Sequence, residues 1–286
     1  MRRIGLLALL PLLGLSISGP SARAATTMVF HRPIVSVGAN KSTNWSGYNQ
    51  GTIEQGGKMF SHITGDWTVP TASAHTKGTD EFSSTWIGIG GGCVDASCNV
   101  PDATLIQAGT EQDVSASGHA SYSAWWELIP APSVTIGDMP IRPGDHMHAD
   151  IGAAAPGVWS MKLKDVTTGK TFSQTVPYPS TEGTAEWIEE TPLIIGTNGG
   201  FAPLPNLSTV NFDLATVNGA NAKLKSSEEV QLVDSNGAPL ATPSAPASDA
   251  DGFNVCAFAK TCPVPSGSLA TTSSRTTTHH HAARKH

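Results

Sequence analysis

Two side chains in this sequence are of the types that hydrolyse bonds, and each lies in a short strand-like segment. Gln107 lies in the run LIQAG (105–109), and Glu186 lies in TAEWIEE (184–190). A carboxylate can take a proton from water as a general base, and an amide can donate a hydrogen bond to an oxygen that becomes negatively charged. The pair therefore predicts a hydrolytic site. The ordinary alternatives are a Gln that bonds within a sheet and a Glu on a solvent-exposed face.

The second segment has a consistent pattern if it is a strand, because alternate side chains of a strand share a face. Glu186, Ile188 and Glu190 then lie on one face, so a pair of carboxylates can line a concave sheet. Trp187 and Glu189 lie on the other face. Only one of Glu186 and Trp187 can therefore point into a cleft, and Glu189 is the acid least expected to act.

The elements that must position these residues are predicted to be β-strands. Short runs alternate β-branched or aromatic residues with polar ones and are separated by Gly, Pro, Asn or Asp, while helical periodicity is nearly absent. The runs are HITGDWTVP (62–70), SYSAWWELI (121–129), HMHADIGA (146–153), GVWSMKLKDV (157–166) and EVQLVD (229–234). This spacing predicts an all-β fold, an antiparallel β-sandwich, formed by one domain over residues 41–265.

Both ends of the chain differ from this domain. Residues 1–24 have a positive start, an apolar middle and an Ala-Arg-Ala exit at 22–24, which predicts a secretory signal peptide and an extracellular protein. The apolar stretch from Ile4 to Ile17 is shorter than the roughly 20 residues of a membrane span. Residues 25–40 are predicted to be a short leader or propeptide remnant, and residues 266–286 a disordered tail rich in Ser, Thr and His.

Charge and composition exclude some partners. Removal of Arg2, Arg3 and Arg23 with the signal peptide lowers Lys+Arg from 17 to 14 against 23 Asp+Glu, a formal charge of −9. This charge argues against nucleic acid, and no later segment predicts a membrane span. Only 14% of the residues are charged, against about 25% in typical domains, which is compatible with stability in acid. A monomer is the default expectation.

Four cysteines form two close pairs, Cys93 with Cys98 and Cys256 with Cys262. In an exported chain such pairs predict two local disulfides. A zinc site of four thiolates is the alternative, but its usual spacing is shorter. No metal is predicted.

Histidines and tryptophans offer further candidates. His146, His148 and Asp150 alternate on one strand and could form a metal trio, although polar residues of an edge strand give the same pattern. Trp86 and Trp187 lie near candidate polar groups. The other tryptophans considered are predicted to pack in the core: Trp45, Trp67, Trp125 and Trp159.

Six blocks in one order resemble the glutamic peptidase family G1, the eqolisins, which is known from fungal acid endopeptidases and bacterial relatives. The blocks are NWSGY (44–48), DWTVPT (66–71), TWIGIGG (85–91), LIQAGT (105–110), YSAWWE (122–127) and TAEWIEE (184–190). The chain is most similar to a bacterial-type member. The resemblance implies two curved, concanavalin-like sheets around a cleft.

The resemblance also implies the roles of residues. Gln107 and Glu186 would be catalytic, and Trp86, Glu127 and Glu190 would support them. Glu186 would activate water and Gln107 would stabilise the oxyanion, with no metal or cofactor and with proteins or peptides as substrates. A Glu with a pKa near its reference of about 4.3 implies an acidic optimum.

Two other functions fit the residues. A β-sandwich with tryptophans on a concave sheet could bind carbohydrate without catalysis. A glycoside hydrolase could use Glu127 and Glu186 as its acid and base, in which case Gln107 would be dispensable.

Overall fold

The computed structural model describes residues 28–99, 101–195 and 200–266. This part of the chain is nearly all β, as predicted, with a short 3-10 helix, η1 (Ser226–Glu228). The predicted signal peptide, and the predicted tail beyond Ser266, lie outside the described residues. Within the described ranges no helix is long and apolar enough to cross a membrane.

One layer of the fold, which we call the site sheet, consists of five antiparallel strands in the spatial order β9-β8-β7-β14-β4. Their bounds are β4 (Trp45–Gly51), β7 (Ser84–Gly90), β8 (Leu105–Val114), β9 (Ala120–Leu128) and β14 (Thr184–Glu190). β10 (Val134–Thr135) pairs with β9 at one edge, and β20 (Glu229–Val233) pairs with β4 at the other.

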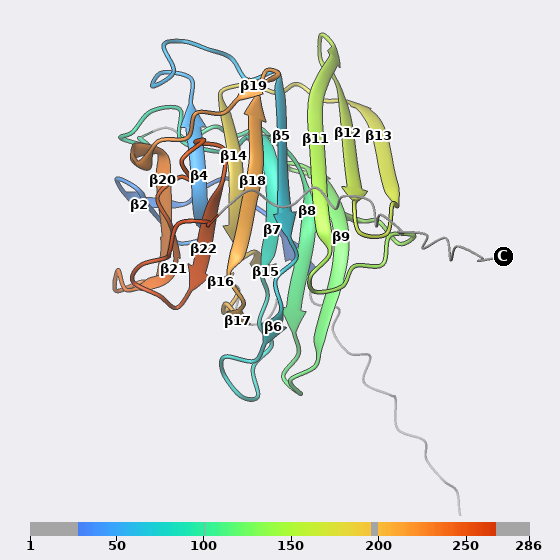
Figure 1. The fold of residues 1–286 in the computed structure, drawn as a ribbon, viewed down its shortest axis with the longest axis vertical. Helices are drawn as coiled ribbons and strands as arrows, with labels where there is room; N and C mark the ends of the chain where they lie inside the picture. Colours follow the sequence, from blue (N-terminus) through green and yellow to red (C-terminus); the bar gives the residue numbers. More distant parts are fainter. Residues whose placement is uncertain (1–27, 100, 196–199, 267–286) are drawn as a thin grey trace, which may run out of the picture.

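The second layer, the back sheet, has the spatial order β13-β12-β11-β5-β18-β22-β21, also antiparallel. Its strands are β5 (His62–Thr68), β11 (His146–Ala155), β12 (Val158–Asp165), β13 (Thr171–Pro177), β18 (Val210–Val217), β21 (Pro239–Pro243) and β22 (Phe253–Ala257). β20 also pairs with β21, so the two sheets join at this edge. Figure 1 views the two layers one over the other.

Short strands complete the fold. They are β1 (Met28–Phe30), β2 (Ser36–Gly38), β3 (Lys41–Ser42), β6 (Ala72–Ser73), β15 (Leu193–Ile195), β16 (Gly200–Phe201), β17 (Asn206–Leu207) and β19 (Ala220–Asn221). β1 pairs with β15, β2 pairs with β3, and β3 pairs with β20. Residues 28–40, which belong to the predicted leader or propeptide remnant, therefore contain two short strands.

The five runs predicted from alternation all fall on strands: β5, β9, β11, β12 and β20. β12 shows the reason most clearly, because its residues alternate between buried and exposed along most of its length. Such a strand covers the core with one face and meets water with the other.

The hydrophobic core lies between the two sheets. Trp67 and Trp159 of the back sheet and Trp187 of the site sheet belong to it and are buried. Trp187 Nε1 donates a hydrogen bond to the Thr64 carbonyl oxygen at 2.9 Å, and Trp67 Nε1 donates to Thr110 Oγ1 at 3.1 Å. Each of these bonds joins one sheet to the other and satisfies a buried indole N–H.

Both predicted disulfides are present, Cys93–Cys98 and Cys256–Cys262. The first closes a small loop that follows β7, the strand that pairs with β14. Pairing in this way uses all four thiols, so the alternative of a zinc site of four thiolates is wrong.

Candidate active site

The site is a row of five residues that lie opposite one another on adjacent strands: Glu127, Gln107, Gly88, Glu186 and Asn49. Cross-strand partners point their side chains to the same face of a sheet. We call these residues the site row and this surface the site face. Their neighbours along the strands point the other way, into the core between the sheets.

The centre of the site row is a glycine. Gln107 and Glu186 are two strands apart, about 10 Å between backbones, and Gly88 between them has no side chain. A Cβ at position 88 would come within 3.0 Å of the Ile106 carbonyl oxygen and of Trp86 Cζ3. The absence of a side chain at Gly88 thus lets Leu105 and Trp86 pack close to the backbone between the two polar side chains.

Gln107 is oriented by Glu127. Its Nε2 donates a hydrogen bond to Glu127 Oε2 at 2.7 Å, and an amide NH2 has a second hydrogen to donate elsewhere. Burial, together with the charge of Glu190, raises the pKa of Glu127 to about 8, although His31 and Gln107 act in the opposite direction. Glu127 therefore holds its proton in acid and at neutral pH.

Polar atoms without hydrogen-bond partners are concentrated in the site row. Gln107 Oε1, Glu127 Oε1 and both carboxyl oxygens of Glu186 are buried and make no well-formed hydrogen bond in the described protein, although the Thr184 hydroxyl is close enough to Glu186 to act on its pKa. Buried polar atoms in folded proteins are almost always paired, so such a group requires an explanation. A polar ligand between Gln107 and Glu186 would provide the missing bonds.

The loop after β7 closes over Glu186. A Cβ at Gly92 would lie 2.5 Å from Glu186 Oε1 and 1.7 Å from Asn49 Oδ1, so only glycine fits there. Asn49 Oδ1 accepts a hydrogen bond from the Cys93 N–H at 2.8 Å, and its Nδ2 donates to the Cys93 carbonyl oxygen at 2.9 Å. Asn49 thereby holds the disulfide loop against the carboxyl group.

Enclosure changes the acidity of Glu186. Burial raises its pKa well above the usual range, and the charge of Asp102 acts in the same direction. The sequence predicts a pKa near the reference of about 4.3. That prediction is wrong for the enclosed state, because the carboxyl group is fully buried and its charge would be poorly hydrated.

Glu190 lies on the site face, in line with Glu186 and Ile188 as the strand period predicts. Its Oε2 accepts hydrogen bonds from Trp86 Nε1 at 2.9 Å and from His31 Nδ1 at 3.0 Å. Its Oε1 accepts from the Arg32 N–H at 3.2 Å. Trp86 thus contacts Glu190 directly, and Glu190 binds the segment that precedes the domain.

The tryptophans divide between two apolar clusters. Trp45, Trp86 and Trp125 pack on the site face with Leu105, Ile188, Ile34 and Val230. The remaining buried ones lie in the core between the sheets. The predicted packing of Trp45, Trp67, Trp125 and Trp159 is confirmed, since each is at most 1% exposed.

The structure adds three residues to those that the sequence predicts. Asn49 lies opposite Glu186, Glu111 lies four positions along β8 from Gln107, and His31 reaches the site face from the leader. Strand alternation indicates Glu111, because it has the same parity as Gln107. No pattern in the sequence indicates His31.

The histidine trio does not gather around one point. His146 and His148 each contact Asp66, at 2.6 Å, whereas Asp150 pairs with His62 at 2.9 Å. Among the residues that the structure describes, no group of three or more His, Cys, Asp or Glu could hold a metal ion.

The fold and the site row together describe the class of protein. It has two joined antiparallel sheets, and a Gln and a Glu lie on either side of a glycine in a buried row on the outer face of one sheet. The Peptidase A4 family model matches residues 43–254, about three quarters of the chain. The chain belongs to this family.

Similarity to individual proteins is more distant. Aspergillopepsin-2 of Aspergillus niger is 27% identical over 170 residues, 52% of this chain and 56% of that protein, so the match spans little more than half of this curated relative. A scytalido-glutamic peptidase with a transition state analog inhibitor has a TM-score of 0.56 at 20% identity, over 75% of this chain and 98% of that one.

The aspergilloglutamic peptidase from Aspergillus niger has a TM-score of 0.50 at 23% identity, over 62% of this chain and 99% of that one. At these identities the two structural likenesses concern the fold.

Proposed function

We propose that the chain is a secreted acid endopeptidase of the glutamic type, which hydrolyses peptide bonds in proteins. Its family supports peptidase activity. The observation that carries the mechanism is the site row, with Gln107 and Glu186 on either side of Gly88. The predicted signal peptide and the two disulfides support export, because disulfides persist in oxidising compartments. A bacterial-type, concanavalin-like monomer stays a prediction.

The proposed reaction begins with a water molecule between Glu186 and the scissile carbonyl. Ionised Glu186 takes a proton from the water, which attacks the carbonyl carbon. The free N–H of Gln107 donates to the oxyanion, while protonated Glu127 keeps the amide oriented. Glu186 then transfers its proton to the leaving amine. These steps need no metal and no covalent intermediate.

The pH dependence follows from the enclosure of Glu186. While buried, this carboxyl group keeps its proton in acid and cannot act as a base. Access of water to the site would lower its pKa toward the reference of about 4.3, where a fraction is ionised at pH 3 to 4. Acid activity therefore requires the site to open.

The geometry favours this function over the two alternatives. Glu127 and Glu186 are three strands apart, about 14 Å between backbones, and Gln107 intervenes. Glycosidase carboxyl groups face each other across about 5 to 9.5 Å, whereas the Glu127 carboxyl group accepts a hydrogen bond from the Gln107 amide, which belongs to the strand between Glu127 and Gly88. Stacking on sugars needs exposed rings, but Trp45, Trp86 and Trp125 on the site face are buried.

The test is hydrolysis of an unfolded protein at pH 3 to 4 by the wild-type chain and by Glu186→Gln and Gln107→Ala variants. Glu189→Gln and Gln112→Ala are matched controls, because both residues are buried on the same strands but face the core. Pepstatin tests for a different acid-peptidase mechanism, and a metal chelator tests for a metal-dependent one.

The expected result is activity that resists both inhibitors, disappears in the two site variants and persists in the two controls. Activity that survives Glu186→Gln would place the chemistry elsewhere. Loss of activity in the Gln107 variant alone would leave the base unassigned and contradict the proposed pairing.

A further inference from the structure

Asp102 is a buried acid that the proposed mechanism leaves without a role. It lies in the connection between β7 and β8, three residues before Leu105, and is 6% exposed. A buried carboxylate is costly to ionise unless hydrogen bonds or charges compensate for the water that it loses. The partners of Asp102 therefore show what this residue holds together.

The side chain of Asp102 joins two segments that are far apart in the sequence. Its Oδ1 accepts hydrogen bonds from the Thr104 N–H and from the Thr104 hydroxyl, each at 2.9 Å. Its Oδ2 accepts from the hydroxyl of Thr181, which is 79 residues further along the chain. Gly183 lies against the same oxygen, because a Cβ there would come within 2.9 Å of Oδ2. Asp102 thus fixes the residues that lead into β14.

The backbone of Asp102 holds the loop that closes over Glu186. Its N–H donates to the Gly92 carbonyl oxygen at 2.8 Å. The Gly92 N–H in turn donates to Thr184 Oγ1, at the start of β14, at 3.1 Å. Gly92 also faces the proposed base, since a Cβ there would lie 2.5 Å from Glu186 Oε1. One glycine therefore connects Asp102, β14 and the carboxyl group of Glu186.

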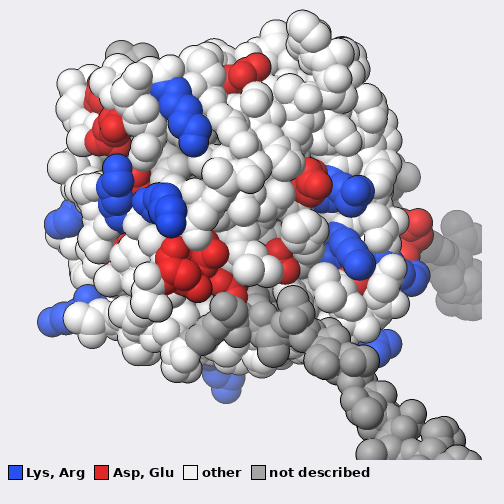
Figure 2. Space-filling view, turned by 45° about the horizontal axis from the view of Figure 1, so that its top comes forward, with Lys and Arg blue, Asp and Glu red and all other residues white. Residues whose placement is uncertain are grey.

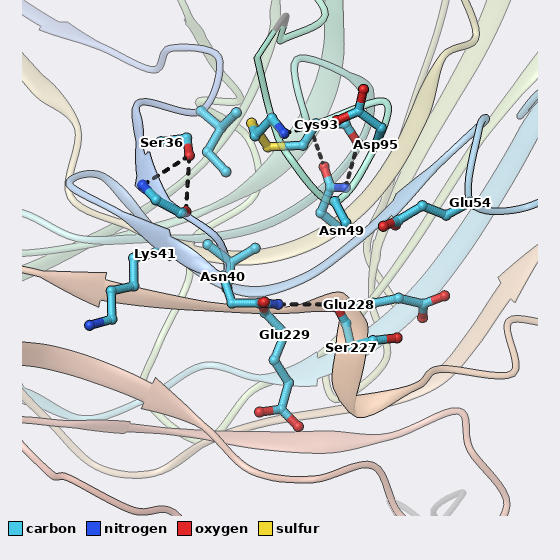
Figure 3. Close-up of a pocket in the computed structure, with 15 residues that line it drawn as sticks. Ser36, Asn40, Lys41, Asn49, Glu54, Cys93, Asp95, Ser227, Glu228 and Glu229 are labelled. Atoms are coloured by element: carbon cyan, nitrogen blue, oxygen red, sulfur yellow. Dashed lines mark hydrogen bonds between the residues drawn. A yellow bond between two sulfur atoms is a disulfide. The ribbon is translucent and has the colours of Figure 1, made fainter.

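Asn49 holds the same loop from the other side. Figure 3 shows its amide directed at Cys93, with which it exchanges two hydrogen bonds. The Ile53 N–H donates to the Val94 carbonyl oxygen at 3.0 Å, so the residues that follow β4 support the disulfide loop as well. The amide of Asn49 is neutral. Of the two side chains that clamp this loop, Asp102 is the one that brings a charge.

The groups that surround Glu186 differ in charge. Gly88 of β7, Gln107 of β8 and Asn49 of β4 lie in its row and are neutral. Charged residues elsewhere on or beside the site face are Glu54, Asp95, Glu127, Glu190, His31 and Arg32. Burial raises the pKa of Glu186, the Thr184 hydroxyl lowers it, and the charge of Asp102 raises it.

We infer that Asp102 is a positioning residue for the proposed reaction, which keeps Gly92 and the start of β14 in place around Glu186 and puts a negative charge beside this base. The inference rests on the proposed function, because it needs Glu186 to act as the base. Asp102 itself does not have to touch the substrate. A nearby negative charge makes Glu186 a stronger base toward water, and it also leaves a smaller fraction of Glu186 ionised in strong acid.

The sign of the expected pH effect follows from the charge. A neutral residue at position 102 removes a repulsion that the ionised form of Glu186 experiences, so Glu186 ionises at lower pH in the variant. More of the variant is then active in strong acid, whereas its weaker base reacts more slowly where both proteins are ionised. The ratio of variant to wild-type kcat/KM should therefore rise as the pH falls. A purely structural role would change the rate by the same factor at every pH.

The first experiment measures kcat/KM on an unfolded protein for the wild-type chain, Asp102→Asn and Asp102→Ser. Asn keeps the shape, because its Oδ1 can accept both Thr104 bonds and the Thr181 hydroxyl can turn to accept from the new amide. Ser removes the same charge with a smaller side chain, so a packing fault in one variant does not decide the result. For both variants the ratio to wild type should be at least about threefold higher near pH 2.5 than near pH 5.

Asp165→Asn is the matched control. Asp165 ends β12 of the back sheet, is 0% exposed, and accepts hydrogen bonds from the Thr168 N–H at 3.1 Å and from the Thr168 hydroxyl at 2.5 Å. It repeats the contact of Asp102 with a threonine on the other sheet. Thr181→Val removes one bond to Asp102 but keeps the charge. Both variants should show a ratio to wild type that does not change with pH, and a constant ratio in both Asp102 variants would overturn the inference.

Carbon-13 NMR separates this inference from the proposed function, since it does not need activity. In a chain with labelled glutamate carboxyl groups, the signal of Glu186 is the one that is missing from Glu186→Gln. Its titration midpoint should lie at lower pH in Asp102→Asn than in the wild type and should not move in Asp165→Asn. An unchanged midpoint in Asp102→Asn would refute the inference alone. A lowered midpoint in a chain that hydrolyses no protein would instead refute the peptidase, and with it the role of Asp102 in the reaction.

Discussion

Two clusters of acidic residues lie on the outer faces of the two sheets, and they are completed differently. On the back sheet, His146 Nε2 and His148 Nδ1 each lie 2.6 Å from one oxygen of Asp66. On the site sheet, both oxygens of Glu186 are buried and make no well-formed hydrogen bond, and the Thr184 hydroxyl is too weak a partner to offset burial. The Asp66 cluster is satisfied by the protein itself, whereas the Glu186 cluster is not.

The acidities of the two carboxyl groups differ accordingly. Burial would raise the pKa of Asp66, but hydrogen bonds from both histidines and their charges outweigh it, so the pKa is lowered. At Glu186 burial dominates and the pKa is raised. The number of titratable residues therefore does not distinguish a structural cluster from a reactive one. The two are distinguished by the hydrogen bonds that each carboxyl group lacks.

Charged residues are sparse on part of the surface. Figure 2 shows a face of the molecule on which most residues are uncharged, with acidic and basic side chains scattered or in small groups. Long-range charge on this face is therefore modest.

The largest effect is expected from Glu186→Gln. Loss of the general base should lower kcat/KM on an unfolded protein at pH 4 by about 10²- to 10⁴-fold. Asp66→Asn, on the other sheet, should change the rate per folded molecule by less than about twofold. A large loss in the Asp66 variant would show that the two clusters do not differ in the way proposed.

Gln107→Ala should have the next largest effect. Removal of an oxyanion donor lowers kcat by about 10²- to 10³-fold in other hydrolases. Gln112→Ala, on the same strand but facing the core, should destabilise the fold without a matching loss in kcat. Steady-state kinetics combined with circular dichroism would separate the two effects, and an unchanged kcat for Gln107→Ala would exclude the amide from catalysis.

A third prediction concerns Glu189, which faces the core and accepts a hydrogen bond from Thr85 Oγ1 at 2.6 Å. Burial raises its pKa to about 8. The folded state keeps this proton above pH 4.5 while the unfolded state loses it, so stability falls as pH rises from about 4.5 to 8. In the Glu189→Gln variant the free energy of unfolding should fall less steeply over this pH range, by up to about 1.4 kcal/mol per pH unit. Denaturant unfolding at several pH values would test it.

The smallest effect is expected from Asp66→Asn on stability. A lowered carboxyl pKa contributes stability above its ordinary value of 3.8, which is lost as pH falls through the folded value. The variant should therefore cost about 1 kcal/mol at pH 7 and little at pH 2. Equal losses at both pH values would indicate that shape, and not charge, makes the histidine contacts important.

Local patterns in the sequence predict much of this structure. Alternation places five strands correctly, and close spacing predicts both disulfides. The same period places Glu186 and Glu190 on one face and Trp187 on the other. These features depend on near neighbours in the chain, whose geometry is set by the pleat of a strand and by the length of a short loop.

Other features could not be derived from local patterns. Gln107 and Glu186 are brought into one row because β7 pairs with both β8 and β14, and the register of each pairing is set by contacts across the core. Nothing near Glu186 in the sequence indicates that Gly92 closes over it and raises its pKa.

The sequence by itself determined the all-β class, several of the strands, the disulfide pairs, the chemical types of the candidate residues and the shared face of Glu186 and Glu190. Only the tertiary structure decided which of those residues meet, which are left without partners, and that His31 binds on the catalytic face. The physical reason is distance along the chain. His31 and Glu190 are 159 residues apart, and their contact exists only after β14 has paired within the site sheet and the N-terminal segment has folded onto its outer face.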